Sequence, residues 1–199
     1  MRFSPLSASA FSFAPLLLQW RRDRLPVVVV DEARVKRFEV TVGGLSRSQV
    51  MSKLRSRGIR LNTHAETLLR DIDFTYRAPS TVAVTARTVL QLGFPTGATL
   101  PQIFEAAQHQ DLLLCPVDTG PYLRIALLEQ EESPNSVLSM GSAPAGALTV
   151  AASALHHDHE YPKGFYLRVV DNESWLRGYR CDDEHIWSSD DRFIFRMPA

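Results

Sequence analysis

Short apolar segments separated by turn residues run along most of the chain, and their spacing predicts both helices and strands. The clearest helix begins after Ser46, because Gln49 occupies the capping-box position and an apolar face follows over residues 50–54. Gly58 stands where a left-handed residue usually ends such a helix. Asn62 is placed to cap a second short helix, so the pattern predicts a helical hairpin.

A third helix is predicted after Thr99, again with a glutamine, Gln102, at the capping-box position. Runs of β-branched, aromatic and other apolar residues predict strands over residues 27–30, 38–42, 81–85, 112–115, 122–128, 148–152, 165–170, 175–179 and 193–195. From residue 122 onward these runs are separated by turns or by a turn-rich stretch. That spacing predicts an antiparallel meander, with a tight turn at Asp171 and Asn172.

The expected fold class is α+β, with N-terminal strands and short helices packed on a C-terminal antiparallel β-meander. The expected organisation is a poorly ordered leader over residues 1–35, followed by a single α+β domain over residues 36–199. Within that domain, residues 36–120 are helix-rich and residues 121–199 form the antiparallel part. A segment rich in Ser, Pro, Gly and Ala at 133–147 is expected to be a surface insertion.

The first 20 residues are apolar enough to raise the question of a secretory signal or a membrane anchor. Pro5 and Pro15 interrupt this run, the main basic cluster follows it, and no small-residue cleavage site comes after it. The two cysteines, Cys115 and Cys181, lack CxxC spacing and are expected to be reduced. We therefore expect a cytoplasmic protein without a membrane segment.

Charge and missing motifs exclude several functional classes. The 22 basic and 22 acidic residues balance, so no overall field draws the chain to nucleic acid or to an anionic membrane. The sequence has no GxxxxGK[ST], no GxGxxG after a strand and no GxSxG. A nucleotide-hydrolysing motor, a dinucleotide oxidoreductase and a serine hydrolase each lack their central motif. No cofactor is expected, and a non-enzymatic role is favoured over an enzymatic one.

The predicted helical hairpin is locally basic, and this is the main functional indication in the sequence. Five positive residues stand between positions 46 and 60 with no acidic residue among them: Arg47, Lys53, Arg55, Arg57 and Arg60. On a capped helix they could contact phosphates, and the segment resembles a SAP-type DNA-binding hairpin. The alternative is that they simply solvate a surface helix. The leading hypothesis is a non-enzymatic binding or accessory module that contacts nucleic acid or a protein partner here. The sequence does not indicate the oligomeric state.

A second hypothesis is a small hydrolase or transferase with its cleft where the helical part meets the predicted meander. Cys115, Asp118 and Arg124 stand close together at this junction, and clefts often form at strand ends. A cysteine nucleophile would need a base, which His109 or His156 could supply. The alternative is a buried, inert cysteine beside a Pro/Gly bend.

Two further clusters have both a functional and an ordinary interpretation. His156, His157 and His159 could ligate a metal such as zinc, although no companion residues stand at HExxH or CxxC spacing, and a polar surface loop is the alternative. The C-terminal strands interleave aromatic residues with arginines: Trp175, Tyr179, Trp187, Arg168, Arg177 and Arg180. They could form a stacking platform for single-stranded nucleic acid, or ordinary cross-strand pairs whose arginines bind nearby acidic residues.

Several phrases of the sequence resemble a family of short uncharacterised bacterial proteins. The phrases are VGGLS at 42–46, LGFPTGAT at 92–99, LCP at 114–116, GFYLR at 164–168, WLRGY at 175–179 and DDRF at 190–193. The resemblance covers residues 36–196 apart from the predicted insertion. Some members carry a helicase label, which this chain does not support because it lacks an ATP-binding loop. The resemblance implies no catalytic residues.

Overall fold

The structure is a computed structural model, and it describes residues 30–32, 35–75, 78–127, 130 and 146–199. The predicted leader lies outside the described residues apart from four positions at its end. The predicted insertion also lies outside them, apart from its last two positions.

The described chain contains both helices and strands, which confirms the α+β class. The helices are α1 (Arg47–Ser56), α2 (Thr63–Asp71), α3 (Leu100–His109), α4 (Thr119–Ala126) and the 3-10 helix η1 (Leu90–Leu92). The strands are β1 (Val30–Glu32), β2 (Val35–Val42), β3 (Arg60–Leu61), β4 (Ser80–Thr88), β5 (Ala98–Thr99), β6 (Leu148–Val150), β7 (Gly164–Val170), β8 (Glu173–Tyr179), β9 (Ile186–Trp187) and β10 (Arg192–Arg196).

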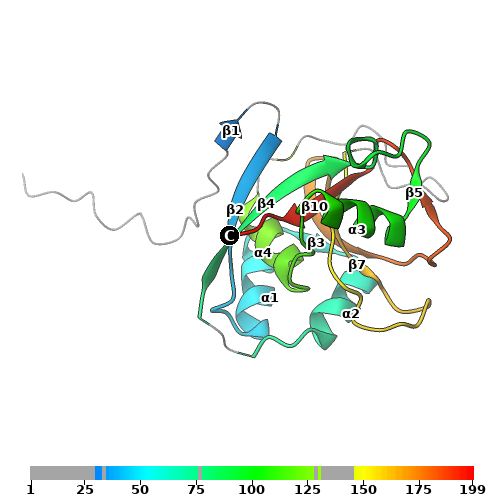
Figure 1. Ribbon diagram of the computed structural model, residues 1–199. Coiled ribbons are helices and arrows are strands. Elements are labelled where there is room, and N and C mark those ends of the chain that lie inside the picture. Colours follow the sequence, from blue (N-terminus) through cyan, green and yellow to red (C-terminus); the bar gives the residue numbers. More distant parts are fainter. Residues whose placement is uncertain (1–29, 33–34, 76–77, 128–129, 131–145) are drawn as a thin grey trace, which may run out of the picture.

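One mixed, strongly curled sheet has the strand order β1-β2-β4-β10-β6-β7-β8-β3, while β5 and β9 pair separately (Figure 1). The predicted meander is correct for β6, β7 and β8, which pair antiparallel in chain order. It is wrong for the last strand, because β10 lies between β4 and β6 and runs parallel to β6. The N-terminal and C-terminal strands therefore belong to one sheet and do not form two packed layers.

Apolar side chains on the two faces of the sheet belong to two cores. Along β10, Ile194 contributes to the first core, whereas Phe193 and Phe195 contribute to the second, as the alternation of a strand requires. The first core also contains residues of α1, α2 and α4, and the second contains residues of α3 and η1. Helices therefore cover both faces of the curled sheet (Figure 1).

Two strand predictions at the junction are wrong. Residues 122–128 were expected to form a strand, but Thr119–Ala126 is a helix whose residues from Thr119 to Ile125 are all buried. A helix that is buried on every side does not need one polar face, so its sequence pattern does not distinguish it from a strand. Residues 112–115 make only isolated bridges, from Leu113 to Arg196 and from Cys115 to Ala152.

The predicted helical hairpin is confirmed in its local detail. Ser46 and Gln49 form the capping box of α1, and Gly58 has a φ of +66°. The Asn62 side chain caps α2 by accepting from the Ala65 amide at 2.9 Å. It also exchanges two hydrogen bonds with the backbone of Gly178 in β8, at 2.8 and 3.0 Å. One amide side chain thus begins α2 and fixes it to the sheet.

Among the described residues, no helix is long and apolar enough to cross a membrane.

Candidate functional site

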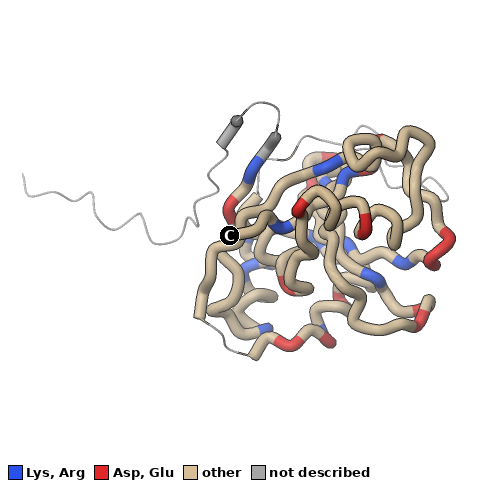
Figure 2. Tube along the Cα trace, in the orientation of Figure 1, with Lys and Arg blue, Asp and Glu red and all other residues tan. Residues whose placement is uncertain are grey.

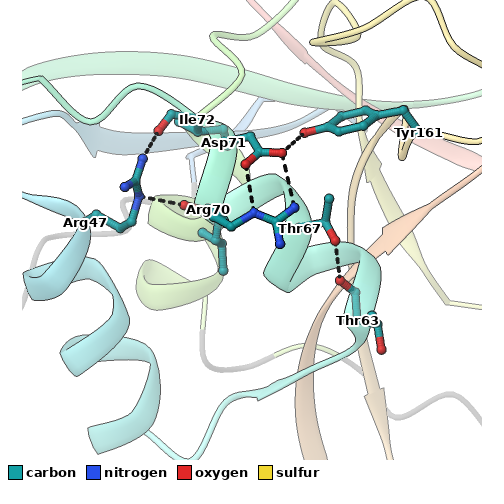
Figure 3. A network of polar contacts seen from close by, with 8 residues as sticks. Arg47, Thr63, Thr67, Arg70, Asp71, Ile72 and Tyr161 are labelled. Atoms are coloured by element: carbon teal, nitrogen blue, oxygen red, sulfur yellow. Dashed lines mark hydrogen bonds and ion pairs between the residues drawn. The ribbon is translucent and has the colours of Figure 1, made fainter.

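Arg47, the first of the predicted phosphate contacts, makes its hydrogen bonds within the fold. Its guanidinium donates to the carbonyl oxygens of Leu69 at 3.0 Å and Ile72 at 2.8 Å, where α2 ends (Figure 3). It also lies 6.0 Å from the centre of the Phe74 ring. A cation at this position satisfies carbonyls that the last turn of a helix leaves unpaired. Arg47 therefore fixes the end of α2 against the start of α1.

Two more of the predicted contacts also have partners within the fold. Arg57 donates to the carbonyl of Ile125 at the end of α4. Arg60 pairs with Glu173 at 2.6 Å. The side chains of Lys53 and Arg55, by contrast, make no hydrogen bond or ion pair in the described part of the chain. Basic and acidic residues are interspersed over the trace in Figure 2. Of the five predicted contacts, Lys53 and Arg55 are therefore the two whose side chains make no polar contact within the described chain.

A pocket of about 290 Å³ lies where three chain connections meet. These are the connection from β2 to α1, the connection from α2 to β4, and the start of α4. Its lining residues are Gly43, Leu45, Asp73, Phe74, Thr75, Pro116, Val117, Asp118 and Tyr122. The volume is close to the lower end of the roughly 300 to 1,000 Å³ that is typical of ligand sites. The pocket can therefore hold a small organic molecule.

The polar groups of the pocket are carboxylates and hydroxyls. Asp118 is 7% exposed and Tyr122 is 1% exposed, while Asp73 and Thr75 are exposed. The Asp73 carboxylate accepts from the hydroxyl and the amide of Thr75, and these bonds, together with the nearby Arg47 charge, hold the pKa of Asp73 below its usual value. An ionised carboxylate accepts hydrogen bonds and cannot donate them. The pocket consequently favours ligands that donate.

Arg47 also supports this pocket. It binds the Ile72 carbonyl one residue before Asp73, and its guanidinium faces the Phe74 ring. Both Asp73 and Phe74 line the pocket. A residue that the sequence indicates as a phosphate contact therefore holds one wall of the pocket in place.

Of the three predicted junction residues, only Asp118 lines the pocket. The buried Cys115 thiol lies 3.6 Å from the Ile194 carbonyl, and burial raises its pKa to about 12, so the thiol is protonated at neutral pH. It makes no hydrogen bond with His109 or His156 in the described chain. The structure therefore does not form the Cys-His pair that a cysteine nucleophile requires.

Arg124 is fully buried, and its side chain makes hydrogen bonds within the fold. Its guanidinium donates to the Gln130 side chain at 2.9 Å and to the Leu127 carbonyl just beyond α4. Burial lowers its pKa to about 10. Gln130 in turn donates to the carbonyls of Gly146 and Leu167, at 2.9 and 3.2 Å. Arg124 thus links the end of α4 to strand β7.

The three histidines lie on the surface, in the loop between β6 and β7. The His156 ring packs edge-on against Tyr161, with ring centres 4.2 Å apart. The Tyr161 hydroxyl donates to Asp71 at 2.9 Å, and Arg70 binds the same carboxylate (Figure 3). In the part of the chain that the structure describes, no group of three His, Cys, Asp or Glu residues could hold a metal ion. His156 therefore helps to fix this loop to the end of α2.

The aromatic residues of the C-terminal strands do not form one platform. Tyr179 and Trp187 belong to the second core, with ring centres 5.4 Å apart. Arg180 pairs with Glu160. The expected pairing with nearby acidic residues is wrong for Arg177, because this side chain makes no ion pair in the described chain. Its guanidinium lies instead over the Trp175 ring, 5.1 Å from the ring centre.

The sequence-based candidate set omitted three polar residues of the pocket, Asp73, Thr75 and Tyr122. Asp73 stands in the connection between α2 and β4, far from Asp118 in the sequence. Tyr122 follows Asp118 by four positions, a spacing that places two residues on one face of a helix. Asp118 and Tyr122 lie on the same side only because this segment is a helix, whereas the sequence pattern predicted a strand from residue 122 onward.

Comparisons with protein-family models, with curated proteins and with solved structures each gave no match. The resemblance that the sequence phrases indicate therefore stays a prediction. Any function proposed for this chain depends on the geometry of its own residues.

Proposed function

We propose that this chain is a non-enzymatic binding protein and that its ligand, a small organic amine, occupies the pocket beside Asp118. The observation that carries the proposal is a buried carboxylate in the lining of a pocket of ligand size. A carboxylate there is an acceptor with a negative charge, so its best complement is a positively charged donor.

The remaining lining residues suit the same chemistry. The rings of Phe74 and Tyr122 line the pocket, and aromatic rings attract ammonium groups. Leu45 and Val117 offer apolar contacts for the carbon skeleton of the ligand. Asp118 is the more buried of the two carboxylates that line the pocket, and it is therefore the proposed anchor for an ammonium group.

The test is titration calorimetry of the full chain with a panel of primary amines, polyols of similar size and carboxylic acids. We expect binding by amines and not by carboxylic acids. Asp118→Asn keeps the shape and an acceptor oxygen but removes the charge, so it should weaken amine binding by about tenfold or more. The control is Asp111→Asn, because Asp111 is exposed outside the pocket and has a φ of +57°, which asparagine tolerates.

Unchanged amine affinity in Asp118→Asn, or no amine binding by the wild type, would contradict the proposal. The alternative of a small hydrolase or transferase uses the same carboxylate, since Asp118 alone of the three junction residues lines the pocket. Conversion of a bound ligand by the wild type, and its loss in Asp118→Asn with binding retained, would favour that alternative.

A second candidate function is contact with nucleic acid or with a protein partner through α1. The observation that favours it is that α1 contains no acidic residue and carries Lys53 and Arg55, whose side chains have no polar partner in the described chain. Arg55 is exposed and Lys53 is partly exposed. Two such cations can contact two phosphates, which is a small electrostatic footprint.

Binding of the full chain to short duplex DNA and RNA across a salt series tests this second candidate. Two phosphate contacts predict a slope of about −2 in the plot of log affinity against log salt for duplex DNA. The double variant Lys53→Ala, Arg55→Ala should lose this salt-dependent binding. Arg192→Ala, which removes an exposed arginine of β10, should retain it. Equal affinity of the double variant and the wild type would exclude α1 as the contact surface.

A further inference from the structure

Two carboxylates line the pocket beside Asp118, and they come from distant parts of the chain. Asp118 stands at the start of α4 and is 7% exposed, whereas Asp73 stands in the connection from α2 to β4 and is exposed. One acidic group of the lining is therefore buried, and the other is open to solvent. A ligand with a single ammonium group at Asp118 would leave the Asp73 carboxylate unused.

The Asp73 carboxylate keeps one oxygen for a ligand. Its Oδ1 atom accepts from the Thr75 amide at 2.7 Å and from the Thr75 hydroxyl, while its Oδ2 atom has no hydrogen-bond donor in the part of the chain that the structure describes. The bonds from Thr75, together with the Arg47 charge, hold the pKa of Asp73 below its usual value, so this carboxylate is ionised at neutral pH. An ionised carboxylate oxygen binds a donor.

Arg47 acts on Asp73 without pairing with it. Within the described chain this arginine forms no ion pair with the Asp73 carboxylate. Its guanidinium donates instead to the carbonyl oxygens of Leu69 and Ile72 at the end of α2 (Figure 3). The charge of Asp73 therefore stays available to a ligand, although Arg47 weakens the attraction for a second cation. We expect a modest gain in affinity from this carboxylate.

The other lining residues suit a carbon chain that carries a positive charge at each end. Leu45, Pro116 and Val117 offer apolar contacts for methylene groups. The rings of Phe74 and Tyr122 attract ammonium groups. The pocket thus combines two acidic groups with apolar and aromatic surface.

We propose that the ligand of this pocket is a short aliphatic diamine, with one ammonium group at Asp118 and the other at Asp73. A dication neutralises both carboxylates, whereas a monoamine neutralises one. The second ammonium group belongs to a ligand that is already held, so its contribution depends on whether the carbon chain spans the two carboxylates. The affinity should therefore depend on chain length. This inference rests on the proposed function and specifies its ligand.

The test is titration calorimetry of the full chain, at constant ionic strength, with α,ω-diamines of increasing chain length and with the monoamines of the same lengths. We expect the affinity of the diamines to pass through a maximum, at which the diamine binds about three- to fivefold more tightly than the matched monoamine. Asp73→Asn keeps an oxygen that accepts from Thr75 but removes the charge, so it should remove most of this advantage. Asp118→Asn should weaken the binding of diamine and monoamine alike. Asp111→Asn, the exposed control outside the pocket, should retain the advantage.

The inference is overturned if no diamine binds more tightly than its matched monoamine, or if Asp73→Asn keeps the full advantage of the diamine. Either result, with monoamine binding that depends on Asp118, leaves the proposed function in place. Binding of no amine at all would overturn the proposed function and this inference together. Because Asp73 is exposed, Asp73→Asn should fold, and it decides the question even if Asp118→Asn does not fold.

Discussion

Replacing Gly178 by alanine is expected to destabilise the fold strongly, because the added methyl group would clash with the backbone of α2. The added Cβ would lie 2.6 Å from the carbonyl carbon of His64 and 2.8 Å from the amide nitrogen of Ala65. Both are backbone atoms in the first turn of α2, so they cannot move aside as a flexible side chain can. We expect a loss of about 3 kcal/mol or more, which lowers the melting temperature by about 10 °C.

The control for this variant is Gly58→Ala, measured by the same thermal and urea unfolding. Gly58 has a φ of +66°, but a Cβ there meets no atom within 4 Å. Its substitution therefore adds backbone strain without a clash and should cost about 1 kcal/mol. If Gly178→Ala proves no more harmful than Gly58→Ala, the close packing of α2 on β8 is contradicted.

Asp191→Asn is expected to stabilise the protein at neutral pH and to flatten the dependence of its stability on pH. Burial, together with the charge of Asp190, raises the pKa of Asp191 to about 6, although the Ser188 amide donates to its carboxylate at 2.8 Å. Because the folded-state pKa lies above the unfolded value, the folded state binds the proton more tightly. Stability from this group is full below the unfolded pKa and is lost as pH rises through the folded pKa.

For a shift of this size, the wild type should lose about 2 kcal/mol between about pH 4.5 and about pH 7.5 through this carboxyl group. Asparagine can still accept from the Ser188 amide but carries no charge, so the variant should keep that stability. Urea unfolding of both proteins at the two pH values measures the difference. Asp111→Asn, at an exposed carboxylate, should follow the wild type. A variant with the same pH dependence as the wild type would show that Asp191 is not the group responsible.

The pocket could be predicted from the sequence only in part. Asp118 stands at a chain junction where clefts form, and the sequence indicates it for that reason. Cys115 was a candidate for the same reason, yet its thiol is buried against the Ile194 carbonyl and does not line the pocket. Asp73 could not be linked to Asp118, because their proximity depends on how the connection after α2 returns to the sheet.

The roles of the basic residues show the same limit. Arg47 and Arg57 both bind carbonyl groups at helix ends, in α2 and α4. These carbonyl groups lie far from the arginines in the sequence. The sequence pattern of a basic run does not show whether its side chains face solvent or donate hydrogen bonds to distant carbonyl groups. Lys53 and Arg55, whose side chains make no polar contact in the described chain, stay the main candidates for the predicted surface.

The sequence by itself determined the features whose energetics are local. The capping box of α1, the cap at Asn62 and the tight turn at Asp171 and Asn172, both with positive φ, were all predicted correctly. Each depends on hydrogen bonds or backbone preferences between residues a few positions apart. The tertiary structure alone decided that Thr119–Ala126 is a helix and that β10 lies between β4 and β6. Those outcomes depend on burial and strand pairing between distant segments, which no local pattern encodes.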